Sequence, residues 1–372
     1  MQINICKVNI MKILLISNMY PSAKDKTYGT FVKMFKEGIE RNTNDILFDC
    51  CFIRGRSNNF MVKVYKYFVF YSVIVYKVLF TKYDFIYNHQ ITHSAPVLRI
   101  CRYLRKFKLV MNIHGSDVVT IDKTSKLLLG IASPLLIDSI LIVVPSEYFK
   151  NIVLDKILGV SPNQLFVSAS GGVCKEVFTC KKNHWVVTNT IVYVSRIDAG
   201  KGWDVLLDAV SELKSRKEIK EKRILFVGYG VQTELLKKRI QELGLLEFCD
   251  YLGPKTHQEL SELYNQADVM IFPTMLYESL GLVGLEAMAC GCPVIGSNIG
   301  CLPEYIKDET TGFLFEPGNS HELANRIVDY YNLSDNQKDI MRMQAIKMAG
   351  KYDSDEISQR LVNKFKDIPF NI

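Results

Sequence analysis

Short apolar runs alternate with longer segments of helical periodicity along almost the whole chain, and this alternation limits the possible folds. Strands separated by helices form βαβ units, whose parallel strands are buried on both faces and are therefore continuously apolar. The predicted strands cover residues 12–17, 46–53, 85–88, 108–113, 141–145, 165–169, 190–195, 223–227, 250–252, 269–272, 293–296 and 313–315. These are too many for one ordinary sheet, so the pattern predicts an α/β protein with two doubly wound, Rossmann-like domains.

The most polar junction between the two sets of strands lies at residues 180–189. We therefore expect an N-terminal domain over residues 1–178, a C-terminal domain over residues 179–352 and a terminal helix within residues 353–372. Parallel sheets of this kind bind ligands beyond the carboxyl ends of their strands, and two facing domains add a cleft. The loops that follow strands are therefore the places to look for chemistry.

The composition limits the partners and the compartment. A formal net charge of +7 fits an anionic substrate or an anionic surface, but does not by itself indicate nucleic acid, and we expect no nucleic acid partner. The ten cysteines are irregularly spaced, with no CxxC pair and no Cys/His group at zinc spacing, so we expect no structural metal. Many thiols without a pairing pattern favour a reducing compartment, most simply the cytoplasm.

The first ten residues do not look like a secretory signal. They carry polar and charged groups where such a signal has an apolar core. An apolar run begins at Met11 instead. We expect residues 1–10 to be an extension of the fold, or translation to begin at Met11.

One loop carries two glutamates on either side of a predicted helix start. Gly281, Leu282 and Val283 begin that helix, whose free amides and positive dipole end suit a diphosphate. Glu278 precedes the helix, and Glu286 lies more than one turn inside it among apolar neighbours. Carboxylates at these places suit hydrogen bonds from a sugar on one flank and a ribose on the other. The structural alternative is an ordinary N-terminal acid and a solvated helix residue.

A second loop, residues 195–202, follows a predicted strand and contains Arg196 and Lys201. An arginine fork and a lysine ammonium in one loop can bind a diphosphate and stabilise it as it leaves. Taken alone, such a pair is more often a solvated loop.

These segments resemble the signature of the family 4 glycosyltransferases, which are retaining enzymes of the GT-B fold. The resemblance rests on a glutamate pair eight positions apart, the second followed by Ala-Met-Ala, then Gly-x-Pro-Val-Ile and Pro-Glu. The chain supplies these as Glu278, Glu286, residues 287–289, Gly291, residues 293–295 and residues 303–304. Two departures are Ser279-Leu280 in place of Gly-Phe and Gly300-Cys301 in place of Gly-Gly, and both bear on the shape of the sugar pocket.

The resemblance implies roles for particular residues. In the family the first glutamate contacts the hydroxyls of the donor sugar and the second the nucleotide ribose, which gives these roles to Glu278 and Glu286. The Arg…Lys-Gly element implies that Arg196 and Lys201 bind the donor phosphates. The family needs no metal or other cofactor, and its terminal helix crosses back to the first domain.

Four further positions match loops of the family. Gly228 and Gly230 follow a predicted strand and match a Gly-x-Gly loop of the nucleotide domain, although without a third glycine they are weak as a dinucleotide motif. Gly29 begins a helix and matches a loop that approaches phosphate or acceptor. His114 ends a strand and resembles a His-Gly segment, where it would hydrogen-bond the reacting sugar or phosphate. The alternative for His114 is a structural histidine, and His89 is a poorer candidate.

Residues 60–80 form a predicted helix rich in Tyr, Phe and Val. Lys63, Lys66 and Lys77 fall within about 60° of one another on it, which predicts a narrow basic stripe on an apolar helix. Lysines inside the run argue against a membrane span. A buried domain helix and a membrane-surface helix both remain open, and nearby arginines and lysines favour contact with anionic lipid.

The resemblance thus implies a retaining, metal-independent hexosyltransferase acting in cell-surface polysaccharide biosynthesis. It would move a sugar from a nucleotide-sugar donor, UDP-sugar by default, to a glycan or lipid-linked acceptor. We expect it in the cytoplasm, peripheral to the inner face of the cell membrane. The rivals are a GT-B nucleotide-sugar epimerase and a non-catalytic, membrane-surface sugar-nucleotide binding protein.

Overall fold

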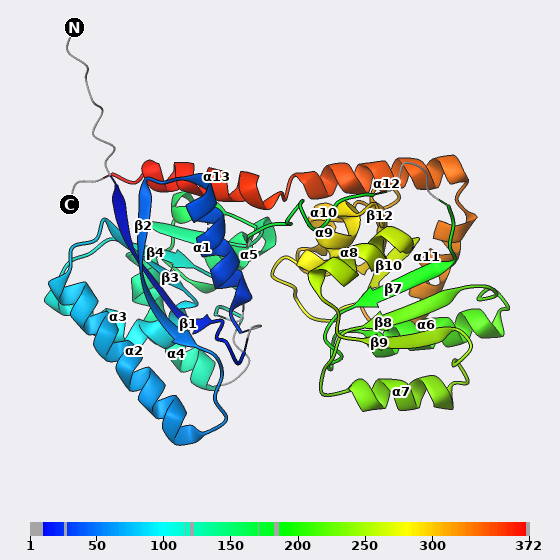
Figure 1. The fold of residues 1–372 in the computed structure, drawn as a ribbon, viewed down its shortest axis with the longest axis horizontal. Helices are drawn as coiled ribbons and strands as arrows, with labels where there is room; N and C mark the ends of the chain where they lie inside the picture. Colours follow the sequence, from blue (N-terminus) through cyan, green and yellow to red (C-terminus); the bar gives the residue numbers. More distant parts are fainter. Residues whose placement is uncertain are drawn as a thin grey trace, which may run out of the picture. The chain divides into compact units, whose positions relative to one another are not determined.

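The computed structural model describes residues 10–25, 28–115, 117–119, 123–169, 171–181 and 186–369. The chain divides into two compact units, the first formed by Met1–Gly171 with Asp355–Ile372 and the second by Gly172–Ser354. Each unit carries one six-stranded parallel sheet with helices packed on it (Figure 1). The predicted α/β class with two doubly wound domains is confirmed.

The sheet of the first unit has the order β2-β1-β3-β4-β5-β6. Its strands are β1 (Met11–Tyr20), β2 (Ile46–Arg54), β3 (Phe85–His89), β4 (Leu109–Asn112), β5 (Leu141–Val144) and β6 (Leu165–Val167). Its helices are α1 (Thr30–Asn42), α2 (Phe60–Phe80), α3 (Ile91–Leu104), α4 (Lys123–Ile137), α5 (Glu147–Lys156), η1 (Pro162–Gln164) and α13 (Ser354–Lys366).

Alternate residues of β1 show how helices cover both faces of this sheet. Leu14 and Ile16 belong to a core that includes buried residues of α2, α3, α4 and α5. Ile13 and Leu15 belong to a second core with buried residues of α1 and α13. Because successive side chains of a strand point to opposite faces, one continuously apolar strand serves both cores.

The sheet of the second unit has the order β12-β11-β10-β7-β8-β9. Its strands are β7 (Thr190–Val194), β8 (Arg223–Val227), β9 (Cys249–Gly253), β10 (Val269–Phe272), β11 (Val294–Ser297) and β12 (Gly312–Phe315). Its helices are α6 (Trp203–Ser215), α7 (Thr233–Glu242), α8 (His257–Gln266), α9 (Leu282–Ala289), α10 (Leu302–Tyr305), α11 (Ser320–Asn332) and α12 (Asp335–Gly350).

Every predicted strand is present, and the ends differ by a few residues, which is the usual uncertainty at strand ends. The division of the chain lies between Gly171 and Gly172 rather than after Phe178. Residues just before Phe178 already pack in the second unit, since the Ser261 hydroxyl donates to the carbonyl oxygen of Val177 at 2.6 Å.

The terminal helix α13 belongs to the first unit. Phe365 of α13 is fully buried against Phe85 and Tyr87, with ring centroids 5.2 and 5.5 Å apart. Lys366 forms an ion pair with Asp45 at 2.7 Å. The last helix therefore completes the core of the domain in which the chain begins.

The three lysines of the predicted basic stripe on α2 differ in their partners. The ammonium of Lys66 donates to the backbone carbonyls of Arg54 and Gly55 at 2.8 and 2.9 Å, and Lys77 pairs with Asp49 of β2. Two of the three lysines are thus turned toward β2 by local acceptors, which helical spacing alone does not reveal. Within the described residues, no helix is long and apolar enough to cross a membrane.

Candidate functional site

The candidate site of the second unit lies at the point where its strand order reverses. The chain runs outward through β7, β8 and β9 and returns to the other side of β7 with β10. The loop after β7 carries Arg196 and Lys201, and the loop after β10 carries Glu278. Because β7 and β10 are parallel neighbours, these two loops emerge side by side at the carboxyl edge, where open α/β sheets bind ligands.

Lys201 and Glu278 form an ion pair across the two loops. Lys201 Nζ lies 2.7 Å from Glu278 Oε1, and the side chains are only 13% and 17% exposed. The same carboxylate oxygen accepts a hydrogen bond from Thr274 Oγ1 at 3.0 Å. A charge-assisted bond in such a sheltered place holds both groups in fixed positions. Thr274 was not predicted; its place directly after a strand and its neighbouring proline were the available signals.

Glycines allow the two loops to approach each other. Gly202 is left-handed, with φ 74°, and a Cβ atom there would lie 1.7 Å from the carbonyl oxygen of Pro273. The amide of Met275 donates to the carbonyl oxygen of Gly200 at 2.8 Å. Only a residue without a side chain fits at Gly202, so this position fixes how far apart Lys201 and Glu278 can be.

Arg196 lies on the exposed side of its loop, with a side chain 71% exposed. Its Nη1 lies 3.0 Å from Asp198 Oδ2, while Asp198 Oδ1 accepts the amide of Val231 at 2.9 Å. Asp198 therefore ties the arginine loop to the loop after β8. A Cβ atom at Gly230 would lie 2.4 Å from Asp198 Oδ1, and one at Gly228 would lie 1.8 Å from the carbonyl oxygen of Ser195.

Helix α9 begins at Leu282, as predicted, after Gly281 in the left-handed region at φ 73°. The amides of Leu282 and Val283 lie in the first turn and have no hydrogen-bond acceptor among the described residues. Tyr305 Oη donates to the carbonyl oxygen of Gly281 at 3.0 Å and fixes the helix start. These two amides are suited to an anionic group.

The carboxyl of Glu286 lies inside α9 in a poorly solvated place. Burial raises the pKa of Glu286 to about 7. The hydroxyl of the fully buried Tyr264 has no hydrogen-bond partner among the described residues, and Glu286 is close enough to raise the pKa of that tyrosine further. Hydrogen bonds from hydroxyl groups of a ligand strongly stabilise the charged form of a poorly solvated carboxyl. The half-buried place of Glu286 argues against the solvated-helix alternative.

The two departures from the family pattern lie beside Glu278. Leu280 is 2% exposed and Cys301 is fully buried, so both contribute bulk beneath the loop. Gly300 has φ 60°, and its Cβ position lies 3.4 Å from the amide nitrogen of Glu278. These residues pack beneath the loop that carries Glu278 and thereby affect where its carboxylate lies.

The first unit carries Gly29 and His114 at the carboxyl edge of its own sheet. Gly29, with φ 73°, precedes α1, and a Cβ atom there would lie 2.6 Å from the backbone of Met19. Phe31, two residues later, packs on the His114 ring with centroids 4.5 Å apart. The turn at Gly29 and the ring of His114 therefore lie close together in this unit.

His114 is paired with His89, which sequence reasoning ranked lower. His89 Nδ1 and His114 Nε2 lie 2.9 Å apart, so one ring nitrogen donates and the other accepts. Burial lowers the pKa of His114 to about 4 and that of His89 well below 6.5. Both rings are thus neutral at physiological pH. Their placement at the ends of the adjacent strands β3 and β4 was the available signal.

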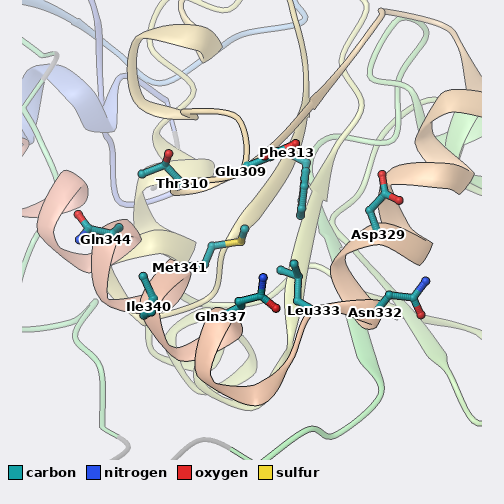
Figure 2. A pocket seen from close by; sticks show the side chains of 10 residues that line it. All are labelled: Glu309, Thr310, Phe313, Asp329, Asn332, Leu333, Gln337, Ile340, Met341 and Gln344. Carbon is teal, nitrogen blue, oxygen red and sulfur yellow. The ribbon is translucent and has the colours of Figure 1, made fainter.

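A cavity of about 830 Å³ lies elsewhere in the second unit (Figure 2). Its lining comes from the turn before β12, from β12, and from α11 and α12, and includes none of the predicted site residues. Within the described ranges, no group of three or more His, Cys, Asp and Glu side chains is placed to hold a metal ion.

Residues 180–348 match the family described as Glycosyl transferases group 1. The chain is 31% identical over 184 residues to an uncharacterized glycosyltransferase of Methanocaldococcus jannaschii, covering 47% of this chain and 44% of the relative. It is 31% identical over 157 residues to D-inositol 3-phosphate glycosyltransferase of Paenarthrobacter aurescens, covering 42% and 38%. The alignments thus span less than half of these relatives.

The fold is similar to that of HepE from Anabaena in complex with UDP and glucose. The TM-score is 0.74 at 18% sequence identity, covering 96% of this chain and all of HepE. The GT-B fold expected from the sequence is confirmed. The segment that carries the expected glycosyltransferase signature, residues 278–304, lies within the matched residues 180–348.

Proposed function

We propose that this protein is a retaining, metal-independent glycosyltransferase that takes its sugar from a UDP-sugar. The acceptor is a glycan or a lipid-linked molecule of cell-surface polysaccharide biosynthesis, and the protein works in the cytoplasm at the inner face of the membrane. The observation that carries the proposal is the Lys201–Glu278 pair at the sheet's switch point, next to the start of α9. HepE, which has the same fold, was solved with UDP and glucose, and this supports UDP as the nucleotide.

The donor diphosphate is held by the second unit. Arg196 supplies an exposed guanidinium, Lys201 an ammonium, and α9 the amides of Leu282 and Val283. These groups act on the negative charge that grows on the leaving phosphate as the bond from the sugar C1 breaks. They serve the purpose for which other transferases use a metal ion.

The carboxylates orient the two ends of the donor. Glu278, fixed by Lys201 and Thr274, accepts hydrogen bonds from the sugar hydroxyls. Glu286 accepts hydrogen bonds from the ribose hydroxyls. Because this carboxylate is poorly solvated, such hydrogen bonds stabilise the bound donor. Both contacts position C1 without a covalent bond to the protein.

The anomeric configuration at C1 is retained when the acceptor attacks from the same side as the one from which the phosphate leaves. The acceptor oxygen forms the new bond to C1, the C1–O bond to phosphate breaks, and the acceptor proton passes to the departing phosphate oxygen. His114 and Gly29 of the first unit contact the reacting sugar or the phosphate. Because its pKa is about 4, His114 acts as a neutral hydrogen-bonding ring and not as a cation.

Mass spectrometry of reactions with UDP-, GDP- and ADP-sugars tests this proposal. A glycosyltransferase yields free UDP and an acceptor heavier by one sugar residue. An unchanged donor mass with altered sugar stereochemistry would instead identify an epimerase. Calorimetric donor binding with no turnover on any acceptor would identify a non-catalytic binding protein.

A further inference from the structure

Two adjoining cavities lie between α2 and the outer edge of the first sheet. β2 is the edge strand of that sheet, so one of its sides has no neighbouring strand. A cavity of about 430 Å³ runs along it, and its walls are Cys50, Cys51, Phe52, Ile53, Arg54, Tyr65, Lys66, Val69, Phe70 and Val73. The lining of the second cavity, of about 310 Å³, is Tyr28, Ile53, Gly55, Arg56, Ser57, Asn58, Lys63, Lys66 and Tyr67.

The first cavity, which we name the apolar groove, is suited to a hydrocarbon chain. Val69, Phe70 and Val73 present one face of α2 to it. Burial raises the pKa of Cys50, and raises that of Cys51 to about 12, so both thiols stay protonated and behave as small apolar groups. The hydrogen-bonding side chains at its border are mainly cationic.

The second cavity, which we name the basic pocket, is suited to a phosphate. Arg56, Lys63 and Lys66 line it together with the hydroxyl of Ser57 and the amide of Asn58. Arg56 is paired with Asp25 at 2.9 Å, whereas the Lys66 ammonium is held by backbone carbonyls and not by a carboxylate. Lys63 is exposed and has no acidic partner among the described residues. The pocket therefore carries uncompensated positive charge.

The two cavities adjoin each other, because Ile53 and Lys66 line both. Tyr28 of the basic pocket stands immediately before Gly29, the residue that precedes α1 at the carboxyl edge of the sheet. A ligand that fills both cavities thus has its anionic end beside the loop to which the resemblance gives contact with phosphate or acceptor, and its apolar end along β2.

The surroundings favour lipid over a second copy of this chain. The side chains that line the two cavities include Arg54, Arg56, Lys63 and Lys66 and no Asp or Glu, so two copies meeting at this face would repel each other. The outer face of α2 is apolar and aromatic, with Met61, Tyr65, Phe68 and Phe80 exposed to 71%, 68%, 69% and 74%. An anionic membrane surface matches both the charge and this face.

We infer that the basic pocket and the apolar groove together bind one lipid molecule that carries a phosphate group on a long hydrocarbon chain. This molecule is the acceptor, or the carrier of the acceptor sugar, in the function proposed above, on which the inference rests. The phosphate contacts Lys63, Lys66 and Arg56, and the chain lies against Val69 and Val73. The inference thus chooses the lipid-linked class of acceptor.

Binding is tested with the full chain and detergent micelles that contain a polyisoprenyl phosphate. Matched micelles contain the same polyisoprenol without phosphate, and a third sample offers inorganic phosphate alone. The groove variants are Val73→Glu, which places a charge in the groove, and Val69→Trp, which fills it without a charge. Lys63→Glu reverses a charge of the pocket, and Leu127→Glu on the exposed face of α4 is the matched control.

We expect saturable binding of the lipid phosphate that is at least about tenfold tighter than binding of the polyisoprenol. Each groove or pocket variant should weaken it by about tenfold or more, while Leu127→Glu leaves it unchanged and circular dichroism shows all variants folded. Equal binding of both lipids, equal competition by inorganic phosphate, or unaltered binding by the groove variants would overturn the inference. A variant-sensitive dimer without lipid binding would assign the groove to a second copy instead.

Donor turnover, measured separately as UDP release, distinguishes the two levels of the proposal. UDP release that persists without lipid-phosphate binding would overturn this inference and leave the proposed function intact. If the variants weaken lipid-phosphate binding but the protein shows no donor turnover, the result would support the lipid site and count against the proposed function.

Discussion

Lys201 Nζ and Glu278 Oε1 lie 2.7 Å apart although the two residues are 77 positions apart in sequence. The ion pair joins the loop that we assign to the donor diphosphate to the loop that we assign to the sugar. It forms because β7 and β10 are neighbours at the reversal of strand order. The two residues are therefore expected to act as one unit.

Lys201→Ala and Glu278→Ala should each lower kcat for sugar transfer by about 100- to 1,000-fold, the usual loss when one group that stabilises the transition state is removed. The double variant should have a kcat only slightly lower than that of either single variant, since each single change already disrupts the ion pair. Steady-state kinetics with a double-mutant cycle measures this coupling.

The control for that cycle is Lys238→Ala, which removes an exposed lysine of the same unit whose carboxylate partner is Glu242. It should leave kcat unchanged. Additive losses for the double Lys201 and Glu278 variant would show that the two groups act independently.

Gly202→Ala should lower the melting temperature and weaken donor binding. A Cβ atom at this position would lie 1.7 Å from the carbonyl oxygen of Pro273, and the left-handed backbone disfavours any side chain. The loops after β7 and β10 must then move apart. Differential scanning fluorimetry and donor calorimetry check both effects.

Gly350→Ala provides the matched control, because a Cβ atom at Gly350 would have no neighbour within 4 Å. It should leave the melting temperature and donor affinity nearly unchanged. Equal behaviour of the two alanine variants would contradict the role given to Gly202.

The strands, their order of appearance and the positions of the loops were predictable because they depend on local patterns. Continuously apolar runs mark buried parallel strands, and residues 269–272 form β10 as predicted. Glycine at 281 marks the start of α9 for a similar local reason. The motif residues were therefore placed on the correct elements.

Pairings over long sequence distances were not predictable. Asp49 draws Lys77 toward β2, and the partner of His114 is His89, which lies on another strand. Helical or strand periodicity describes one element at a time, so it does not show which neighbouring element offers an acceptor. The sequence also did not show that the residues before Phe178 already pack with α8.

Donor affinity should increase as the pH rises through about 7. Burial raises the pKa of Glu286 to about 7, so its acceptor form becomes populated only around and above that pH. Calorimetry with an intact UDP-sugar between pH 6 and 8.5 checks this, since its diphosphate does not titrate in that range. Glu286→Gln should remove the dependence, and an unchanged pH profile in that variant would contradict the assignment.

Acid should destabilise the protein between pH 6.5 and about 4 through its histidine pair. Burial lowers the pKa of His114 to about 4 in the folded state, whereas an unfolded histidine titrates near 6.5. The unfolded state thus binds more protons in this window, and the free energy of unfolding falls as the pH decreases. Urea denaturation at pH 5 and pH 7 measures the difference. His114→Gln should reduce it, and an equal pH dependence in the variant would show that His114 titrates normally.

The most direct test of the central claim is donor turnover by the wild-type protein and by Glu278→Gln, which keeps the size of the side chain but removes its charge. With a UDP-sugar and acceptor lipids, we expect UDP release and a glycosylated product of retained anomeric configuration from the wild type. The folded variant should turn over the donor at least about 100-fold more slowly. Turnover by Glu278→Gln at the wild-type rate, or no turnover of any nucleotide sugar by the wild type, would show that Glu278 does not serve sugar transfer in this protein.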